Sequence, residues 1–394
     1  MTQEDFYYSW TPQNARVDFP VARAELDQFV LADGRRIYDF ISCSFQANFG
    51  HSQPVIMNRV KEQLSVMPIA SPKSTFALKQ SVSKRLNRLI DRGPGKLFYT
   101  VSGAESVENA LKIARQITGR KIVLARQKSY HGASLGALSV TGDWRNPPHL
   151  TFDEGTVRIP EHEDDPELHA TKQIIAETGP EQIAAVILET ISGTNGMSIP
   201  EQKWFDGIQA LCREFGIKLI LDEVLVGFGR CGPAFAFHDF GLSPDLVCMS
   251  KAITGGYIPF GAVWTHPEIS SHYDQNMLAC GLTNYAHPLG LAALDGVLQL
   301  LEDPEFEQLK RVNEKLFGDF VRSLGENSLV QEVRVKGLMA AIYLNHPAPT
   351  WQNGFDAGMH LYGKGNLNIL APPYNTDSQK MLNALVKYTE IAGL

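Results

Sequence analysis

The sequence predicts an α/β protein with a large domain, whose mostly parallel sheet is covered by helices, and a smaller α+β domain. Three observations predict this fold class. Strand-like apolar runs alternate with helix-like stretches through the middle of the chain, whereas the C-terminal part changes to a charged helix, short strands and a final helix. At 394 residues, the chain is too long for one small core.

The alternation of strands and helices begins near residue 97. The segment 97–119 starts as a strand, turns at Ser102 and Gly103, and continues with the apolar spacing of a helix. The segment 204–216 has the pattern of a helix that ends at Gly216. Such alternation predicts a mostly parallel sheet with helices on both faces. Further strands are expected within 121–132, 183–193, 217–221, 244–256 and 260–265.

The two ends of the chain are expected to form the smaller domain together. From about Asp303 the sequence predicts a charged helix, then short strands around "VRVKGLMAAIYL", then a final helix from Ser378. Near the N-terminus, "FVLADGRRIYDF" has the pattern of a hairpin that turns at Asp33 and Gly34. The expected division is an N-terminal segment of residues 1–45 that joins the small domain, a large domain of residues 46–300 and a C-terminal small domain of residues 301–394.

Composition and charge exclude several classes of protein. The net charge is −7 and dense Lys/Arg blocks are absent from the sequence, which argues against a nucleic-acid or acidic-membrane surface. No apolar run approaches the roughly 20 residues that span a bilayer, and the start "MTQEDFYYSW" does not resemble a secretory signal. The five cysteines form no CxxC pair, which argues against a disulfide framework or a zinc site. We expect a soluble, cytoplasmic protein without a bound metal.

Polar and small residues follow the predicted strands of the large domain. In doubly wound sheets, ligands bind beyond the carboxyl ends of the strands. A small-residue turn that leads into a helix N-terminus suits a phosphate, and an aromatic side chain can stack on a planar ring. The candidate residues are Ser102, Gly103, Ala104, Tyr130, His131, Glu189, Asp222 and Lys251.

Asp222 and Lys251 point to one cofactor. A carboxylate at the end of a buried strand is costly unless a cation meets it, and a protonated ring nitrogen is such a cation. A lysine can form a Schiff base with an aldehyde. Together these residues predict a pocket for pyridoxal 5'-phosphate (PLP), with Lys251 as covalent anchor and Asp222 as partner of the ring nitrogen.

Each of these features also has an ordinary structural explanation. Ser102 is a common kind of helix cap, Asp222 suits a cap or an ion pair, and Lys251 alone suits a solvated position. His131 is as compatible with packing as with catalysis. The order of the residues along the chain, each at the end of a predicted strand, favours the cofactor site.

Along nearly its whole length the chain resembles the class III aminotransferases of PLP fold type I, the ω-aminotransferase group. The matching segments are "SGAESVENALKIAR", "YHGASLGALSVTG", "LDEVLVGFGRCGPAFAFHDFGLSPDLVCMSKAITGGYIPFGAV", "GLTNYAHPLGLAALDGVL" and "VKGLMAAIYL". The resemblance implies that Ser102, Gly103 and Ala104 bind the phosphate. It places the cofactor ring between Tyr130 and Val224, with His131 and Glu189 nearby. Catalysis is assigned to Lys251, Asp222 and Tyr130.

The resemblance also suggests a partner subunit and a substrate channel. Thr283 matches a threonine that reaches the phosphate in the neighbouring subunit, which implies a homodimer with shared active sites. Glu189 matches an acid near the substrate. The segment "FYYSWTPQ" resembles members that act on taurine-like and other ω-amino acids, and Trp10, Phe45 and Gln46 are the candidate channel residues.

Four departures from the family pattern concern the cofactor and the substrate. Leu225 stands where a glutamine is frequent, and Thr190 replaces a proline after Glu189. Ala133 and the region of Ile369 occupy positions where glutamate-using members carry arginines. Recognition of two carboxylates generally requires such fixed cations.

The expected donor is therefore an amine or an ω-amino acid, and the expected acceptor is pyruvate or another small oxo acid, with poor use of 2-oxoglutarate. Arg145 is the one candidate to replace the missing arginines, although it is expected to be a solvated loop residue. The same scaffold also hosts racemases, aminomutases, decarboxylases and phospho-lyases, which the cofactor residues do not separate from transaminases. A protein that binds the cofactor without catalysis is a further alternative.

Overall fold

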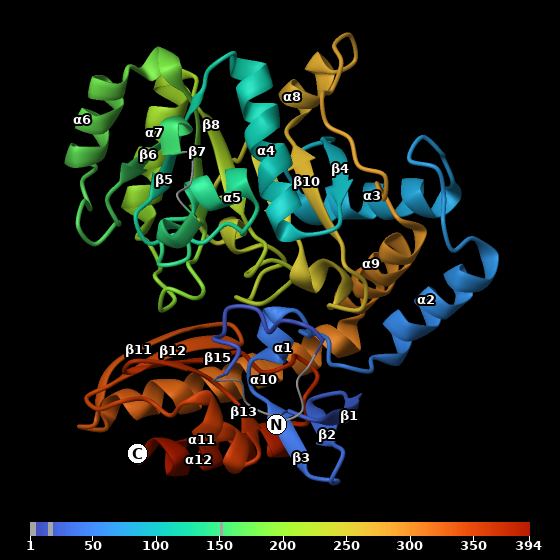
Figure 1. The fold of residues 1–394 in the computed structure, drawn as a ribbon, viewed down its shortest axis with the longest axis vertical. Coiled ribbons are helices and arrows are strands. Elements are labelled where there is room, and N and C mark those ends of the chain that lie inside the picture. Colours follow the sequence, from blue (N-terminus) through green and yellow to red (C-terminus); the bar gives the residue numbers. More distant parts are fainter. Residues whose placement is uncertain (1–4, 15–18, 150–152) are drawn as a thin grey trace.

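The computed structural model describes residues 5–14, 19–149 and 153–394, which form the two parts seen in Figure 1. The larger part holds a wide sheet flanked by helices. The smaller part contains the C-terminal helices and strands, and the N-terminal strands lie beside them (Figure 1). Residues 1–4 of the segment considered for a secretory signal lie outside the described residues.

The central sheet has seven strands. They are β4 (Lys96–Thr100), β5 (Ile122–Arg126), β6 (Thr156–Ile159), β7 (Ile183–Glu189), β8 (Lys218–Asp222), β9 (Leu246–Met249) and β10 (Gly261–Thr265). Their spatial order is β4-β10-β9-β8-β7-β5-β6. Neighbouring strands from β9 to β6 are parallel, whereas β10 is antiparallel to both β9 and β4. The prediction of a mostly parallel sheet is confirmed.

The inner strands of this sheet are buried on both faces. Every residue of β7 and the last four residues of β8 are buried, as expected for near-continuous apolar runs in a parallel sheet. Figure 1 shows the helices that flank the sheet. They include α4 (Gly103–Thr118), α5 (Leu135–Val140), α6 (His169–Thr178) and α7 (Gln202–Phe215).

Local signals in the sequence set the ends of two of these helices. Ser102 caps α4, because its side chain accepts a hydrogen bond from the N–H of Glu105. Gly216 follows α7 with a left-handed φ of 62°, which glycine adopts without strain. The predicted strand–turn–helix unit at 97–119 and the predicted end of the helix at Gly216 are therefore confirmed.

A second group of helices borders the edge of the sheet that β4 forms. The group consists of α2 (Pro54–Val66), α3 (Ala77–Ile90), α8 (Pro267–His272) and α9 (Pro288–Leu301). Helix α9 packs closely on α2 at Gly296, where an added Cβ would lie 2.8 Å from the Cα of Ile56. Among the described residues, no helix is both long and apolar enough to cross a membrane.

The C-terminal part has its own antiparallel sheet. Its elements are α10 (Pro304–Ser323), β11 (Val330–Lys336), β12 (Met339–Leu344), α11 (Trp351–Asp356), β14 (Tyr362–Lys364), β15 (Leu367–Leu370) and α12 (Ser378–Ala392). The strand order is β11-β12-β15-β14. Asp303 caps α10 and Asp377 caps α12, so the two predicted helices are confirmed.

The N-terminal strands pair with a strand from the C-terminal part. They are β1 (Val21–Glu25), β2 (Gln28–Leu31) and β3 (Arg36–Asp39), and β13 (Met359–His360) pairs parallel with β3. The predicted hairpin turn lies between β2 and β3, where Gly34 has φ 88°. The domain boundaries near residues 45 and 301 stay a prediction.

Candidate active site

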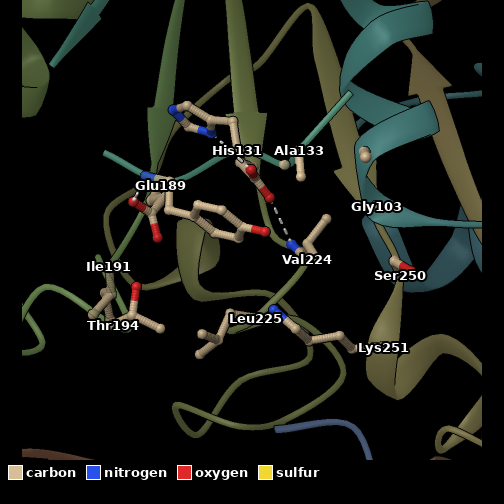
Figure 2. A pocket seen from close by; sticks show the side chains of 14 residues that line it. Gly103, His131, Ala133, Glu189, Ile191, Thr194, Val224, Leu225, Ser250 and Lys251 are labelled. Atoms are coloured by element: carbon tan, nitrogen blue, oxygen red, sulfur yellow. Dashed lines mark hydrogen bonds and ion pairs between the residues drawn. The ribbon is translucent and has the colours of Figure 1, made fainter. Parts of the chain in front are cut away.

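The carboxyl ends of β5, β7, β8 and β9 border a cavity of about 270 Å³. Figure 2 shows Gly103 and Lys251 on one side of this cavity and Glu189 and Thr194 on the other. We call it the cofactor cavity, because it brings together most residues predicted for the cofactor. Those that line it are Gly103, Ala104, Tyr130, His131, Glu189, Asp222, Val224 and Lys251.

Asp222 ends β8, and hydrogen bonds hold both oxygens of its carboxylate. Oδ1 accepts a hydrogen bond of 3.0 Å from the N–H of Val224, and Oδ2 lies 2.8 Å from Nδ1 of His131. Asp222 is only 5% exposed, and among the described residues no lysine or arginine forms an ion pair with it. A buried carboxylate of this kind is costly without a cation, so the site suits a ligand with a protonated nitrogen.

The next residue, Glu223, does not line the cavity, and its carboxylate holds neighbouring loops together. Its carboxylate accepts hydrogen bonds from the hydroxyl of Thr190 at 2.6 Å and from the N–H groups of Ala236 and Phe237. These bonds tie the loops after β7 and β8 to a short turn further along the chain. Thr190, one of the departures noted in the sequence, therefore has a structural role.

The N-terminus of α4 provides the expected anion site. The first N–H groups of a helix have no partner inside the helix, and the helix dipole is positive there. Ser102 caps the helix and does not line the cavity, whereas Gly103 and Ala104 do. An added Cβ at Gly103 would lie 2.9 Å from Cγ1 of Val224, so the glycine leaves room for a ligand at this point.

Lys251 follows β9 in a left-handed conformation with φ 49°. Burial lowers the pKa of its amine, and Arg145 lowers it further, although Asp222 and Glu189 oppose the shift. A lowered pKa increases the neutral fraction of the amine, which is the form that attacks an aldehyde. The environment of Lys251 therefore suits a Schiff-base lysine.

Glu189 faces the cofactor cavity, but its carboxylate is hydrogen-bonded. It accepts hydrogen bonds from the N–H groups of Tyr130 and Gly193 and from the hydroxyl of Ser192, at 3.1 to 3.4 Å. Burial raises its pKa. Among the described residues it has no ion pair with a lysine or an arginine. The acid is therefore held in place by hydrogen bonds, with the charge of the buried Arg126 nearby.

A second cavity, of about 650 Å³, adjoins the first. We call it the substrate cavity. Tyr130, Thr194 and Lys251 line both cavities, so they mark the junction between them. Trp10 and Phe45, two of the predicted channel residues, line the substrate cavity. The third predicted channel residue does not line either cavity: Gln46 hydrogen-bonds instead to Sγ of Cys43 and lies close to Gly256.

Arg145 also lines the substrate cavity, which corrects the expectation of a solvated loop residue. Its side chain is 12% exposed and pairs with Asp143. The guanidinium carbon lies 4.3 Å from the ring centre of Tyr130, 5.0 Å from that of Trp144 and 5.5 Å from that of Trp10. Among the described residues, Nε of Arg145 has no hydrogen-bond partner. The ion pair and the three rings therefore hold a cation beside Lys251.

Several residues of the substrate cavity were missed in the sequence. They are Ile41, Ser44, Trp144, Thr194, Tyr362, Gly363 and Lys364. For Trp144, the available signal in the sequence was its position next to Arg145, which was already a candidate. Tyr362 and Lys364 lie on β14, far along the chain, and no local pattern relates that strand to the active site. Of the noted departures, Ala133 and Leu225 line the cofactor cavity, whereas Ile369 is fully buried in β15.

Thr283 lies outside both cavities of its own chain. It is exposed in a turn before α9, and the residue that caps α9 is His287. The alternative explanation of Thr283 as the cap of this helix is therefore wrong. Its predicted contact with a second subunit stays a prediction.

The residues of the cofactor cavity fit PLP. A helix N-terminus with a glycine at its start suits the phosphate, and a buried carboxylate without a lysine or arginine partner suits the ring nitrogen. Tyr130 and Val224 provide flat and apolar surfaces for the ring, and Lys251 has a lowered pKa.

Comparisons with known proteins show which family this chain is similar to. A family model described as aminotransferase class III matches residues 11–391. An omega-aminotransferase from Caulobacter vibrioides is 32% identical over 379 residues, with 86% of each chain covered. An acetylornithine aminotransferase from Bacillus cereus is 31% identical over 366 residues, with 89% of each chain covered.

Two solved structures are similar over almost the whole chain. One is a taurine:2-oxoglutarate aminotransferase from Bifidobacterium kashiwanohense in complex with PLP and glutamate. It has a TM-score of 0.93 at 29% identity, with 98% of this chain and 95% of that chain covered. The other is a PLP-bound amine transaminase from an uncultivated Pseudomonas species. It has a TM-score of 0.90 at 26% identity, with 100% and 99% covered.

Proposed function

The chain belongs to the class III aminotransferases, a PLP-dependent family of fold type I, and we propose that its amino donor is an amine or an ω-amino acid. Taurine-like donors are included, and the proposed acceptor is a small oxo acid such as pyruvate. One observation carries the proposal. Lys251 lies where the cofactor cavity meets a second cavity, and that cavity contains Arg145 within a cage of aromatic rings.

The cofactor residues divide the work of holding PLP. The N–H groups of Gly103 and Ala104, at the start of α4, would bind the phosphate. The rings of Tyr130 and the cofactor would stack, with Val224 against the opposite face. Asp222 would hold a proton at the ring nitrogen, and His131 would keep the carboxylate in position through its bond of 2.8 Å.

PLP supplies an aldehyde that takes up the amino group and a ring that accepts the electron pair released when the donor carbon loses its proton. Lys251 would remove this proton and hold it for return, because the residue lines both cavities and its amine has a lowered pKa. The other residues that line the two cavities would orient the donor and exclude water from the site.

Arg145 is the proposed anchor for an acid group of the substrate. A guanidinium matches the geometry of a carboxylate or a sulfonate, and Asp143 leaves part of its donors available. The aromatic walls of the same cavity suit the apolar part of an amine. An ω-amino acid would place its amine at Lys251 and its acid group at Arg145.

Pyruvate is the proposed acceptor because it carries a single carboxylate. When ionised, Glu189 would repel a second carboxylate on the cofactor side, and Ala133 provides no cation there. One observation favours 2-oxoglutarate as an alternative. Lys364 lines the substrate cavity together with Arg145, so this cavity offers two cations.

We also propose a cytoplasmic homodimer. Thr283 is exposed and does not line its own cavities, which agrees with a contact to the phosphate site of a second subunit.

Separate half-reactions test the proposal. The PLP-loaded enzyme is mixed with single donors (taurine, β-alanine or an aryl alkylamine), and absorbance follows the conversion of the cofactor from its aldehyde to its amine form. Pyruvate or 2-oxoglutarate is then added to regenerate the aldehyde form. We expect ω-amino acids or amines to drive the first step and pyruvate to drive the second. Loss of substrate carbon dioxide or racemisation without conversion of the cofactor would contradict transamination.

A further inference from the structure

A strained backbone turn forms part of the wall of the substrate cavity. Four consecutive residues, Ser42 to Phe45, have left-handed φ values of 45°, 48°, 61° and 68°, and none of them is glycine. They make up the short element α1 (Ser42–Phe45). Side chains other than glycine are strained in this conformation, and single residues rather than runs usually adopt it. Such strain persists only where the surrounding structure imposes it.

This turn contributes two residues to the wall of the substrate cavity. Ser44 and Phe45 line the substrate cavity, together with Lys251 and Arg145. The turn is closed by hydrogen bonds from the N–H of Phe45 to the carbonyl of Ile41 and from the N–H of Gln46 to the carbonyl of Ser42. A right-handed turn at the same place would direct Ser44 and Phe45 elsewhere, so the handedness of the backbone sets this wall.

Asp39 holds the beginning of the turn. Its carboxylate accepts hydrogen bonds from the N–H groups of Ile41 and Cys43. The carboxylate is in turn held by two histidines: Nε2 of His51 lies 2.7 Å from Oδ2, and Nδ1 of His360 lies 2.9 Å from Oδ1. Asp39 is fully buried, so these four contacts replace water completely. His360 belongs to β13, which pairs with the strand that carries Asp39.

A second set of contacts holds the Ser42 side chain. Its hydroxyl donates a hydrogen bond of 2.6 Å to the carbonyl of Ala371 and accepts one of 3.0 Å from Arg230. These contacts fix one residue, whereas the bonds to Asp39 fix the path of the backbone into the turn. The carboxylate is therefore the group that can impose the left-handed conformation on Cys43.

We propose that Asp39 is a positioning residue for the substrate. Its carboxylate, held by His51 and His360, imposes the left-handed turn that places Ser44 and Phe45 in the wall of the substrate cavity. Asp39 touches neither cavity, so it acts on substrate binding and not on the proton transfer. The inference rests on the proposed function, because it requires that this cavity binds the amino donor.

The proposal predicts a specific pattern in the kinetics of Asp39→Asn. Asparagine keeps only one acceptor oxygen, so its amide nitrogen faces either the N–H of Ile41 or that of Cys43, and one of the two backbone bonds to the turn is lost. We expect KM for the donor to rise about tenfold or more while kcat changes less than about threefold, as for loss of binding outside the transition-state contacts. The affinity for PLP, measured by titration of the apoenzyme, should stay unchanged.

A glycine at position 43 should relieve the backbone strain and so rescue the defect of Asp39→Asn. Glycine adopts left-handed φ values freely, so Cys43→Gly no longer needs the brace. The double variant Asp39→Asn/Cys43→Gly should recover a KM within about threefold of the wild type. Cys43→Val, in which a β-branched side chain opposes the conformation, should reproduce the defect of Asp39→Asn.

A matched control separates positioning from general destabilisation. Asp165 is also buried and also anchors backbone, through the N–H groups of Ala170 and Thr171. Asp165→Asn should lower the melting temperature without changing KM. Turnover of the wild-type enzyme with the same donor is measured first. If the wild type does not turn over the donor, the proposed function fails; the proposal for Asp39 is judged only by the comparison of its variants with an active wild type. An unchanged KM in folded Asp39→Asn, or a raised KM that Cys43→Gly does not correct, would overturn the proposal.

Discussion

Nδ1 of His131 lies 2.8 Å from Oδ2 of Asp222, and both residues line the cofactor cavity. The other oxygen of Asp222 accepts a hydrogen bond from the backbone of Val224. The carboxylate is therefore fixed in orientation before any ligand arrives. Such preorganisation is favourable for catalysis, because no reorganisation is needed when charge develops on the ligand.

Asp222→Asn should bind PLP but lose most of its activity. The amide cannot stabilise a proton at the ring nitrogen, so the ring becomes a poorer electron acceptor. We expect kcat/KM to fall roughly 10³-fold, which corresponds to about 4 kcal/mol of transition-state stabilisation. Steady-state kinetics and a PLP titration measure the two effects. His131→Ala, which removes the contact to Asp222 but keeps the carboxylate, should show a smaller loss, and near-normal turnover in Asp222→Asn would assign the proton to another group.

The uptake of PLP by the apoenzyme should depend on pH through Lys251. Burial, with Arg145, lowers the pKa of Lys251 below its ordinary value of 10.5. An amine attacks an aldehyde only when it is neutral, that is, above its pKa. The rate of uptake should therefore rise with pH and level off before pH 10.5 is reached. Stopped-flow absorbance between about pH 6 and 10 measures this rate.

A chemical label checks the identity of this lysine. Borohydride reduction of the PLP-loaded enzyme should fix the cofactor on the peptide that contains Lys251. A label on a different lysine would contradict the assignment, even if the pH profile agreed.

Arg145→Ala should impair substrates that carry an acid group. A charge-assisted hydrogen-bonded pair contributes about 1.5–3 kcal/mol, so kcat/KM for ω-amino acids and pyruvate should fall roughly 10- to 100-fold. Amines without an acid group should be affected much less as donors. Arg35→Ala is a suitable control, because Arg35 pairs with Asp33 in the exposed hairpin turn.

The same variant decides between the two acceptors. We expect wild-type kcat/KM to be higher for pyruvate than for 2-oxoglutarate. If 2-oxoglutarate is used equally well or better, and both Arg145→Ala and Lys364→Ala lose that activity, the two cations of the substrate cavity bind a dicarboxylate.

Thr283→Ala should weaken PLP binding without disturbing the fold. Its exposed hydroxyl is expected to bind the phosphate in a second subunit, and one hydrogen bond of this kind is worth about 1 kcal/mol. The Kd for PLP should therefore rise roughly fivefold, while the melting temperature of the apoenzyme stays the same. Thr118→Ala, on a helix of the same chain, provides a comparison. Sedimentation that finds an active monomer at assay concentration would refute the shared site.

The sequence alone determined six of the seven strands of the central sheet and two helix ends, but it did not predict β6. It also predicted the cofactor residues. Buried strands are continuous apolar runs, and local caps such as Ser102 and Gly216 end or begin helices wherever they stand. Because parallel strands carry their carboxyl ends to one edge, residues after separate strands were expected to meet. Asp222 and Lys251 do line one cavity.

Only the tertiary structure revealed which residues line the substrate cavity. Arg145 was expected in solvent, because its own segment contains only loop residues, yet Trp10 from the N-terminal segment and Tyr130 from the loop after β5 enclose it. Tyr362 and Lys364 reach the same cavity from the C-terminal part. Contacts between residues so far apart in sequence leave no periodic pattern, so only the packing of the two parts reveals them.

The left-handed turn of Ser42–Phe45 is the clearest case of a conformation that the local sequence does not predict. "ISCSF" contains no glycine, so local preference predicts ordinary right-handed or extended backbone there. In our proposal, the carboxylate of Asp39 in β3 imposes these φ values, and His51 from the loop before α2 and His360 from β13 hold that carboxylate in place. Local sequence determines conformation where local interactions dominate. Where distant groups supply the stabilising hydrogen bonds, as they do for Asp39, only the assembled structure determines it.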